Sequence, residues 1–70
     1  MLTWAYMTWR VEHLGAENAR VRAVNGEELD SKERPSFYEA LTRAGDDGWE
    51  LVALDGNFGA LVFKRPKADE

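Results

Sequence analysis

A single short segment of this sequence has the spacing of an amphipathic helix, which limits how much of a sheet the chain can cover. Ser36, followed three residues later by Glu39, has the spacing of a capping box and predicts the start of the helix. The helix is about three turns long, so it can shield only one face of a sheet. Its apolar positions follow the i, i+3, i+4, i+7 spacing: Phe37, Ala40, Leu41 and Ala44.

The segments on both sides of this helix have the composition and alternation of strands. Residues 2–14 are rich in aromatic and β-branched types, and residues 20–24 alternate polar with apolar. Asn25-Gly26 predicts a turn, and residues 27–34 predict a loop. Residues 49–54 and 60–65 predict two further strands joined by a hairpin loop over 55–59, and Pro66 ends the last one. The pattern predicts an α+β fold with two layers in the order β-β-α-β-β, a mostly antiparallel sheet with one helix packed on one face.

Residues 45–52, Gly-Asp-Asp-Gly-Trp-Glu-Leu-Val, contain two glycines and two carboxylates before an apolar run. A phosphate clamp is disfavoured, because the two aspartates would repel the anion. We expect a structural turn in which Gly45 is the left-handed residue after the helix, Gly48 redirects the backbone and Trp49 opens the next strand. With only Glu50 polar, residues 49–54 resemble a central strand covered on both sides.

The first strand has large apolar residues on both of its faces. Trp4, Tyr6 and Arg10 point one way, whereas Met7 and Trp9 point the other. Parity alone leaves open which of the two tryptophans faces the helix. The expected core consists of Phe37, Leu41, Trp49, Val52, Leu54, Leu61 and Phe63.

The length and composition of the chain predict one small domain over residues 1–66, followed by a frayed tail over 67–70. A chain of 70 residues buries only about 60% of the surface that its unfolded form exposes, and this one has no cysteine for disulfides. Association with another copy is the remaining route to stability. The net charge of −4 gives little general attraction for nucleic acid. No apolar run is long enough to cross a membrane, and a cytoplasmic protein is expected.

No residue pattern points to catalysis, to a cofactor or to a metal. His13 follows Glu12, but neighbours on a strand point to opposite faces and cannot easily form an acid–base pair. Asp55 and Asn57 have the spacing of calcium ligands without the glutamate that would complete the loop. We therefore expect no enzyme activity, and no catalytic, cofactor-binding or metal-binding residue.

The aromatic residues of the first strand instead suggest an interface. Tryptophan, tyrosine and arginine are enriched at protein interfaces, and a single helix leaves one sheet face without cover. The leading hypothesis is a self-associating interaction module; an unidentified protein partner is also possible. The alternatives are a single-stranded nucleic-acid binder that uses the same rings, and a small-molecule pocket at a dimer seam lined by Trp4, Tyr6 and Trp9. The expected interface residues are Trp4, Tyr6, Trp9, Arg10 and Arg22.

Several motifs together resemble a family of short bacterial proteins known as domain of unknown function 4177. They are Trp4-x-Tyr6, Arg-x-x-Asn-Gly-Glu-Glu over residues 22–28, Gly-x-x-Gly-Trp-Glu-Leu-Val over 45–52 and the closing Phe-Lys-Arg-Pro over 63–66. Ala5 stands where members often carry an acidic residue. The resemblance spans nearly the whole chain and implies a compact α+β domain of bacteria or their phages. It implies no activity and no catalytic residue.

Overall fold

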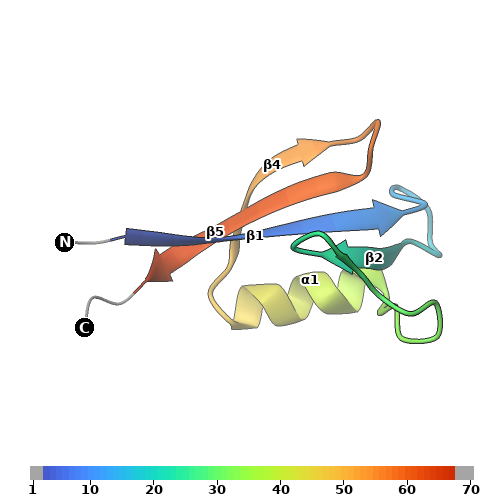
Figure 1. Ribbon diagram of the computed structural model, residues 1–70, viewed down its shortest axis with the longest axis horizontal. Coiled ribbons are helices and arrows are strands. Elements are labelled where there is room, and N and C mark those ends of the chain that lie inside the picture. Colours follow the sequence, from blue (N-terminus) through green and yellow to red (C-terminus); the bar gives the residue numbers. More distant parts are fainter. Residues whose placement is uncertain (1–2, 68–70) are drawn as a thin grey trace.

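Five antiparallel strands form one sheet, and a single helix packs against one of its faces (Figure 1). The structure is a computed structural model that describes residues 3–67, so Leu2 of the expected first strand lies outside the described residues. The predicted α+β fold, with one helix on an antiparallel sheet, is confirmed. The elements are β1 (Thr3–Glu12), β2 (Arg20–Val24), β3 (Glu27–Glu28), α1 (Phe37–Asp46), β4 (Glu50–Asp55) and β5 (Ala60–Lys67).

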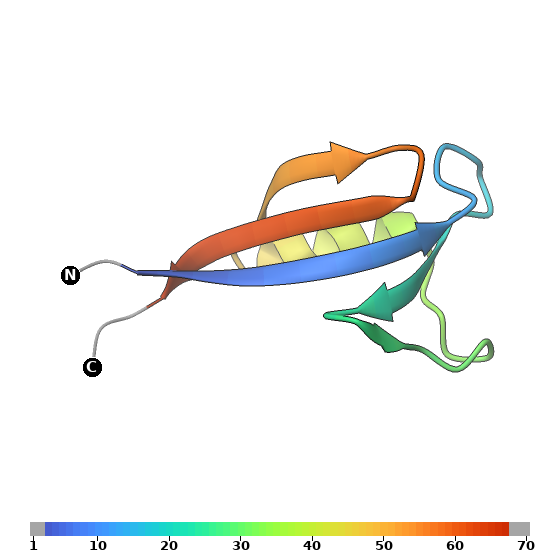
Figure 2. The ribbon, with the colours of Figure 1, turned by 45° about the horizontal axis from the view of Figure 1, so that its top comes forward.

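The strand order is β3-β2-β1-β5-β4, which places β1 at the centre of the sheet. β1 pairs with β2 at one end and with β5 along most of its length, from Thr3 opposite Lys67 to Arg10 opposite Ala60. α1 lies behind β1 and β5, as the turned view shows (Figure 2). We call the side of the sheet that packs on α1 the helix face, and the opposite side the open face.

The core lies between the helix face and α1, and Trp9 is at its centre. The indole is only 5% exposed, 4.4 Å from the ring of Phe63 and 6.5 Å from that of Phe37. Trp9, and not Trp4, is therefore the tryptophan of β1 that faces the helix.

The predicted core residues are buried to different degrees. Leu61 and Phe63 are buried as predicted, whereas Phe37, Leu41 and Trp49 pack against the core but are only partly buried. The buried cluster is Trp9, Val11, Ala19, Val21, Ala44, Leu61 and Phe63.

The prediction that residues 49–54 form a covered central strand is wrong. β4 is an edge strand, and Val52 and Leu54 are exposed rather than part of the core, Leu54 by 58%. β4 is paired only with β5, which lies between it and β1, and all six of its residues are exposed. An apolar run is compatible with a covered strand, but it does not fix the order of strands in the sheet.

The helix ends two residues later than predicted, and Gly48 rather than Gly45 is the left-handed residue. Gly45 is helical, and α1 continues to Asp46. Gly48 has φ of +87°; its N–H donates to the Gly45 carbonyl at 3.0 Å, and the Trp49 N–H donates to the Ala44 carbonyl at 2.9 Å. These two hydrogen bonds make a Schellman motif, which satisfies the last carbonyls of the helix.

The start of α1 is held by backbone pairing and not by the expected capping box. Ser36 stands at the N-cap position, but its side chain makes no capping hydrogen bond. Its backbone forms an isolated bridge with Arg20, and the N–H of Phe37 donates to the Ala19 carbonyl at 2.9 Å. The helix therefore begins where the chain leaves a strand-like contact with the start of β2.

The predicted turns are present, but β5 runs further than predicted. Asn25 and Gly26 have φ of +52° and +84°, as a two-residue hairpin turn between β2 and β3 requires. β5 continues through Pro66 to Lys67, so Pro66 does not end the strand and Lys67 is not part of a frayed tail. Proline is tolerated there because β4 starts opposite Lys64, which leaves β5 with one neighbour beyond that point. Residues 68–70 of the expected tail lie outside the described residues.

Candidate functional site

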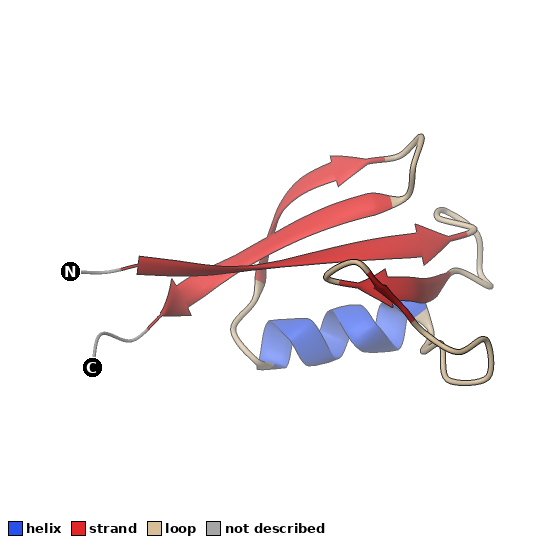
Figure 3. Ribbon diagram, in the orientation of Figure 1, coloured by secondary structure: helices blue, strands red, loops and turns tan. Residues whose placement is uncertain are grey.

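The clearest candidate for a functional surface is a two-stranded arm that projects from the body of the domain. We define the arm as Thr3–Tyr6 of β1 with Lys64–Lys67 of β5. These residues pair with each other, while β2 pairs with β1 only from Trp9 onward and β4 starts opposite Lys64. Figure 3 shows the arm extending past the end of α1. An isolated pair of strands is marginally stable in water, so the arm has less support than the rest of the sheet.

Two aromatic side chains lie on the open face of this arm. Trp4 is 40% exposed and Tyr6 is 62% exposed. Both residues alternate with Ala5 and Met7, which lie on the helix face with Trp9. The ammonium of Lys64 is 4.3 Å from the centre of the Trp4 ring, a cation–π contact that holds the indole in place. The arm therefore presents two large rings to solvent, one of them fixed by a neighbouring cation.

The structure separates the five predicted interface residues. Trp4, Tyr6 and Arg10 lie along one face of β1 and are exposed. Trp9 is buried on the opposite face, so its assignment to an interface is wrong, and it cannot line one pocket together with Trp4 and Tyr6. The physical reason is strand parity: an odd-numbered residue of β1 shares its face with Val11, under the helix.

Arg22 belongs to a cluster of charges at the other end of the sheet. Its Nε donates to the Glu28 carboxylate at 2.9 Å, and Arg34 contacts both Glu28 at 3.3 Å and Glu12 at 3.2 Å. The hydrogen bond and the charge of Arg22 lower the pKa of Glu28 below its ordinary value of 4.5, and the charge of Arg34 acts in the same direction. The guanidinium of Arg22 is therefore already paired within the chain.

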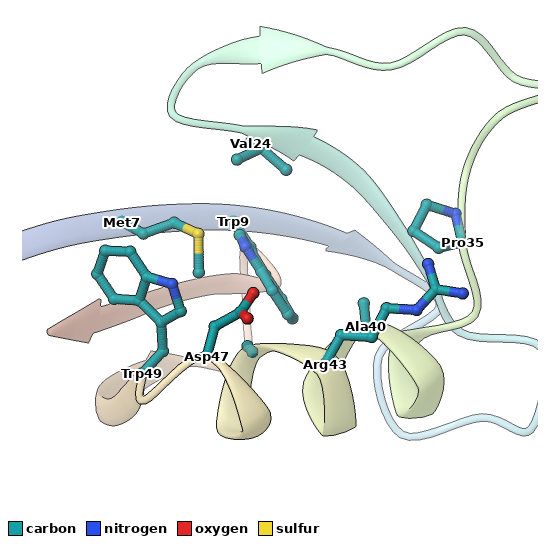
Figure 4. Close-up of a pocket in the computed structure, with 9 residues that line it drawn as sticks. Met7, Trp9, Val24, Pro35, Ala40, Arg43, Asp47 and Trp49 are labelled. Atoms are coloured by element: carbon teal, nitrogen blue, oxygen red, sulfur yellow. The ribbon is translucent and has the colours of Figure 1, made fainter. Parts of the chain in front are cut away.

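An open cleft of about 250 Å³ lies between α1 and the sheet. Met7, Trp9 and Trp49 form part of its apolar wall; Arg43 comes from the last turn of α1, and Asp47 follows the end of the helix (Figure 4). Its volume is below the roughly 300 to 1,000 Å³ of ordinary ligand pockets. The cleft is best explained by incomplete packing of a short helix, because α1 is too short to cover the sheet fully.

The corner at Gly48 and Trp49 is a structural turn, as predicted, whereas Gly45 belongs to α1 and not to the turn. The guanidinium of Arg65 lies 4.3 Å from the centre of the Trp49 ring, and its Nη1 donates to the Asp47 carbonyl at 2.9 Å. Arg65 thus joins β5 to the turn after α1. No local pattern in the sequence signals this contact, because it depends on the pairing of β5 with distant parts of the chain.

The described residues contain no arrangement typical of a metal centre. Within residues 3–67, no group of three His, Asp or Glu side chains lies close enough to hold a metal ion. His13 is exposed in the turn after β1, with φ of +56°. No helix in the described part of the chain is long and apolar enough to span a membrane.

Comparisons of the chain with protein-family models, with curated proteins and with solved structures find no match. The resemblance to domain of unknown function 4177 therefore stays a prediction. The fold and the exposed arm are the observations on which a function can be argued.

Proposed function

We propose that this chain is a non-catalytic interaction module that binds a second copy of itself through the arm. The observation that carries this proposal is the exposure of Trp4 and Tyr6 on a ribbon of only two strands. Large aromatic side chains are common at the centres of protein interfaces, where they bury much area at a low entropic cost. A second copy supplies an equally apolar surface and gives the ribbon the neighbours that it lacks.

The mass of the protein in solution tests this proposal directly. Light scattering across a dilution series is expected to give twice the chain mass at high concentration and the chain mass on dilution. Tyr6→Ala should shift this transition to higher concentration. Phe58→Ala is the matched control, because Phe58 is a similarly exposed aromatic, at 67%, but lies in the turn between β4 and β5. A chain mass at every concentration would rule the proposal out.

Single-stranded nucleic acid is a second candidate partner, favoured by one observation. The open face of the sheet combines Trp4, Tyr6 and Arg10 of β1 with Lys64 of β5, and exposed rings beside cations can stack bases. The net charge of −4 weakens any general attraction. Quenching of tryptophan fluorescence by an oligonucleotide at low salt, lost in Trp4→Ala and reduced by added salt, would favour this function over self-association.

A further inference from the structure

Besides the short end of β5 beyond Lys64, which contains Pro66, the sheet has three unpaired backbone edges within the described residues, and they differ in how well they are protected. The outer strand β3 has only two residues, both glutamate. β4 carries Glu50 and Asp55 at its ends and has a bulge between Leu51 and Ala53. Short strands, charges and bulges are the usual means by which proteins prevent edge-to-edge pairing. These two edges are therefore poor templates for another strand.

The third edge belongs to β1 and has none of these protections. From Thr3 to Met7, β1 pairs only with β5, because β2 joins it from Trp9 onward. These five residues carry no charge, and the register between β1 and β5 runs without a bulge from Thr3 to Arg10. Aromatic and threonine residues also favour extended backbone. An open, regular and uncharged edge is the kind that accepts a further strand.

Asn25 sets the limit of this edge. The side-chain oxygen of Asn25 accepts a hydrogen bond from the Thr8 N–H at 2.9 Å, and the Asn25 N–H donates to the Thr8 carbonyl at 2.7 Å. The turn between β2 and β3 thus occupies the backbone of Thr8. The free edge therefore ends at Met7, and a strand that pairs with it has to fit beside Thr3–Met7.

Resting on the proposed function, we infer that two copies join through this edge, with β1 of one copy antiparallel to β1 of the other and Ala5 on the two-fold axis. This register uses all five residues of the edge within the described range: Thr3 lies opposite Met7 of the second copy, and Ala5 lies opposite Ala5. Directly opposite residues share a face in an antiparallel pair, so Trp4 and Tyr6 of the second copy meet on the open face. The two five-stranded sheets become one continuous sheet.

The inferred register makes the contact between two copies self-complementary. A two-fold axis repeats each cross-strand contact, and because Trp4 and Tyr6 lie symmetrically about Ala5, the same pair of rings forms twice. Each Trp4 then has Pro66 of its own β5 on one side and Tyr6 of the second copy's β1 on the other. A register shifted toward Thr8 would displace the Asn25 hydrogen bonds.

Cysteine cross-linking tests the register, because the native chain has no cysteine. In the inferred dimer, two copies of Ala5→Cys face each other with Cα atoms about 4.5 to 5.5 Å apart, within the range of a disulfide. Mild oxidation should therefore convert this variant to a covalent dimer. Thr3→Cys is the matched control. Residue 3 lies opposite residue 7 of the second copy, so the two copies of residue 3 are separated by four residues, about 14 Å, along the strands. This variant should cross-link much less.

A charge at the same position tests the edge without relying on oxidation. In Ala5→Glu the new carboxylate lies opposite Arg65 of its own chain, which suits the monomer, but faces a second carboxylate across the two-fold axis. Ala5→Glu is expected to lose the dimer at concentrations where the wild type forms one, whereas Ala5→Gln, with a side chain of the same shape and no charge, should keep it. Circular dichroism of both variants confirms that the fold is retained.

The outcomes separate this inference from the proposed function. A wild-type chain that stays monomeric at all concentrations overturns both. A dimer in which Ala5→Cys cross-links no faster than Thr3→Cys, or which survives Ala5→Glu, overturns the register while self-association stands. Selective cross-linking of Ala5→Cys together with loss of the dimer in Ala5→Glu supports the inferred edge.

Discussion

The indole of Trp9 lies against the ring of Phe63, with centroids 4.4 Å apart and planes inclined by 50°. The two residues come from the first and the last strand, and Phe37 of α1 meets the same indole edge-on at 6.5 Å. Three elements that are distant in the sequence therefore converge on one side chain. Trp9 is the residue through which the helix and the centre of the sheet share a core.

Trp9→Ala is accordingly expected to be among the most damaging single substitutions. Removing a buried tryptophan typically costs about 3 to 5 kcal/mol, a large part of the stability of a small domain. Trp49→Ala should cost less, because the Trp49 indole is only partly buried and borders the cleft. Urea denaturation at one protein concentration measures both. Equal losses for the two variants would contradict the assignment of Trp9 as the central core residue.

The two glycines of the corner should respond to alanine in opposite directions. Gly45 is helical, and a methyl group in place of its Cα hydrogen would meet no atom within 4 Å beyond its chain neighbours and its own helical backbone, so Gly45→Ala should stabilise the fold by about 0.5 to 1 kcal/mol. Gly48 has φ of +87°, so Gly48→Ala should destabilise it by about 1 kcal/mol or more. Thermal melting of the two variants checks the signs. A higher melting temperature for Gly48→Ala would contradict the Schellman geometry.

Gly59 should tolerate substitution least among the glycines. A Cβ there would overlap the carbonyl oxygen of Val11, whose N–H donates to the Gly59 carbonyl at 2.7 Å, and φ is +62°. The carbonyl oxygen of Val11 belongs to the backbone and cannot move away from the new Cβ at a low cost in free energy. Gly59→Ala is expected to lower the urea midpoint more than Gly48→Ala does. Gly56→Ala, in the same turn and with open space around it, is the control and should have little effect.

The ion pair between Arg22 and Glu28 should make stability depend on pH in the acid range. The pKa of Glu28 is lowered in the folded chain by its hydrogen bond to Arg22 and by the charge of Arg22, with the charge of Arg34 adding to the effect. Its contribution is therefore present above the ordinary pKa of 4.5 and is lost as the pH falls through the lower folded value.

The matched variant for this prediction is Glu28→Gln, which keeps the shape of the side chain and removes its charge. The difference in urea midpoint between the wild type and this variant should be constant above about pH 6 and shrink below the ordinary pKa of a glutamate. A difference that does not change across the acid range would show that the carboxylate of Glu28 contributes no more when ionised than when protonated.

Local patterns in the sequence predicted the element types well. The i, i+3, i+4 spacing located α1, and Asn25-Gly26 located a hairpin turn, because both signals depend on residues that are close in the chain. The parity of β1 also separated Trp4 and Tyr6 from Trp9, although it did not show which set faces the helix. That choice depends on where α1 packs, which is a property of the whole fold.

The position of β4 was missed for a related reason. Residues 51–54 are apolar whether the strand is central or exposed at an edge, and nothing local places β5 between β4 and β1. The arm was not predicted either, since it exists only because β1 and β5 extend beyond the points where β2 and β4 pair with them. Trp4 and Tyr6 could be proposed as interface residues from their type, but the free backbone edge beside them is visible only in the structure.

The pairing of Met7 with Phe63 has a consequence for how the protein is made. The central strand is synthesised early, yet its main neighbour is β5, which emerges from the ribosome only after the helix and β4. Until then Trp9 has no Phe63 to pack against, and contacts between segments so distant in sequence form slowly. We expect the nascent chain to hold a local β2–β3 hairpin and a transient α1, and to acquire its core in one late step.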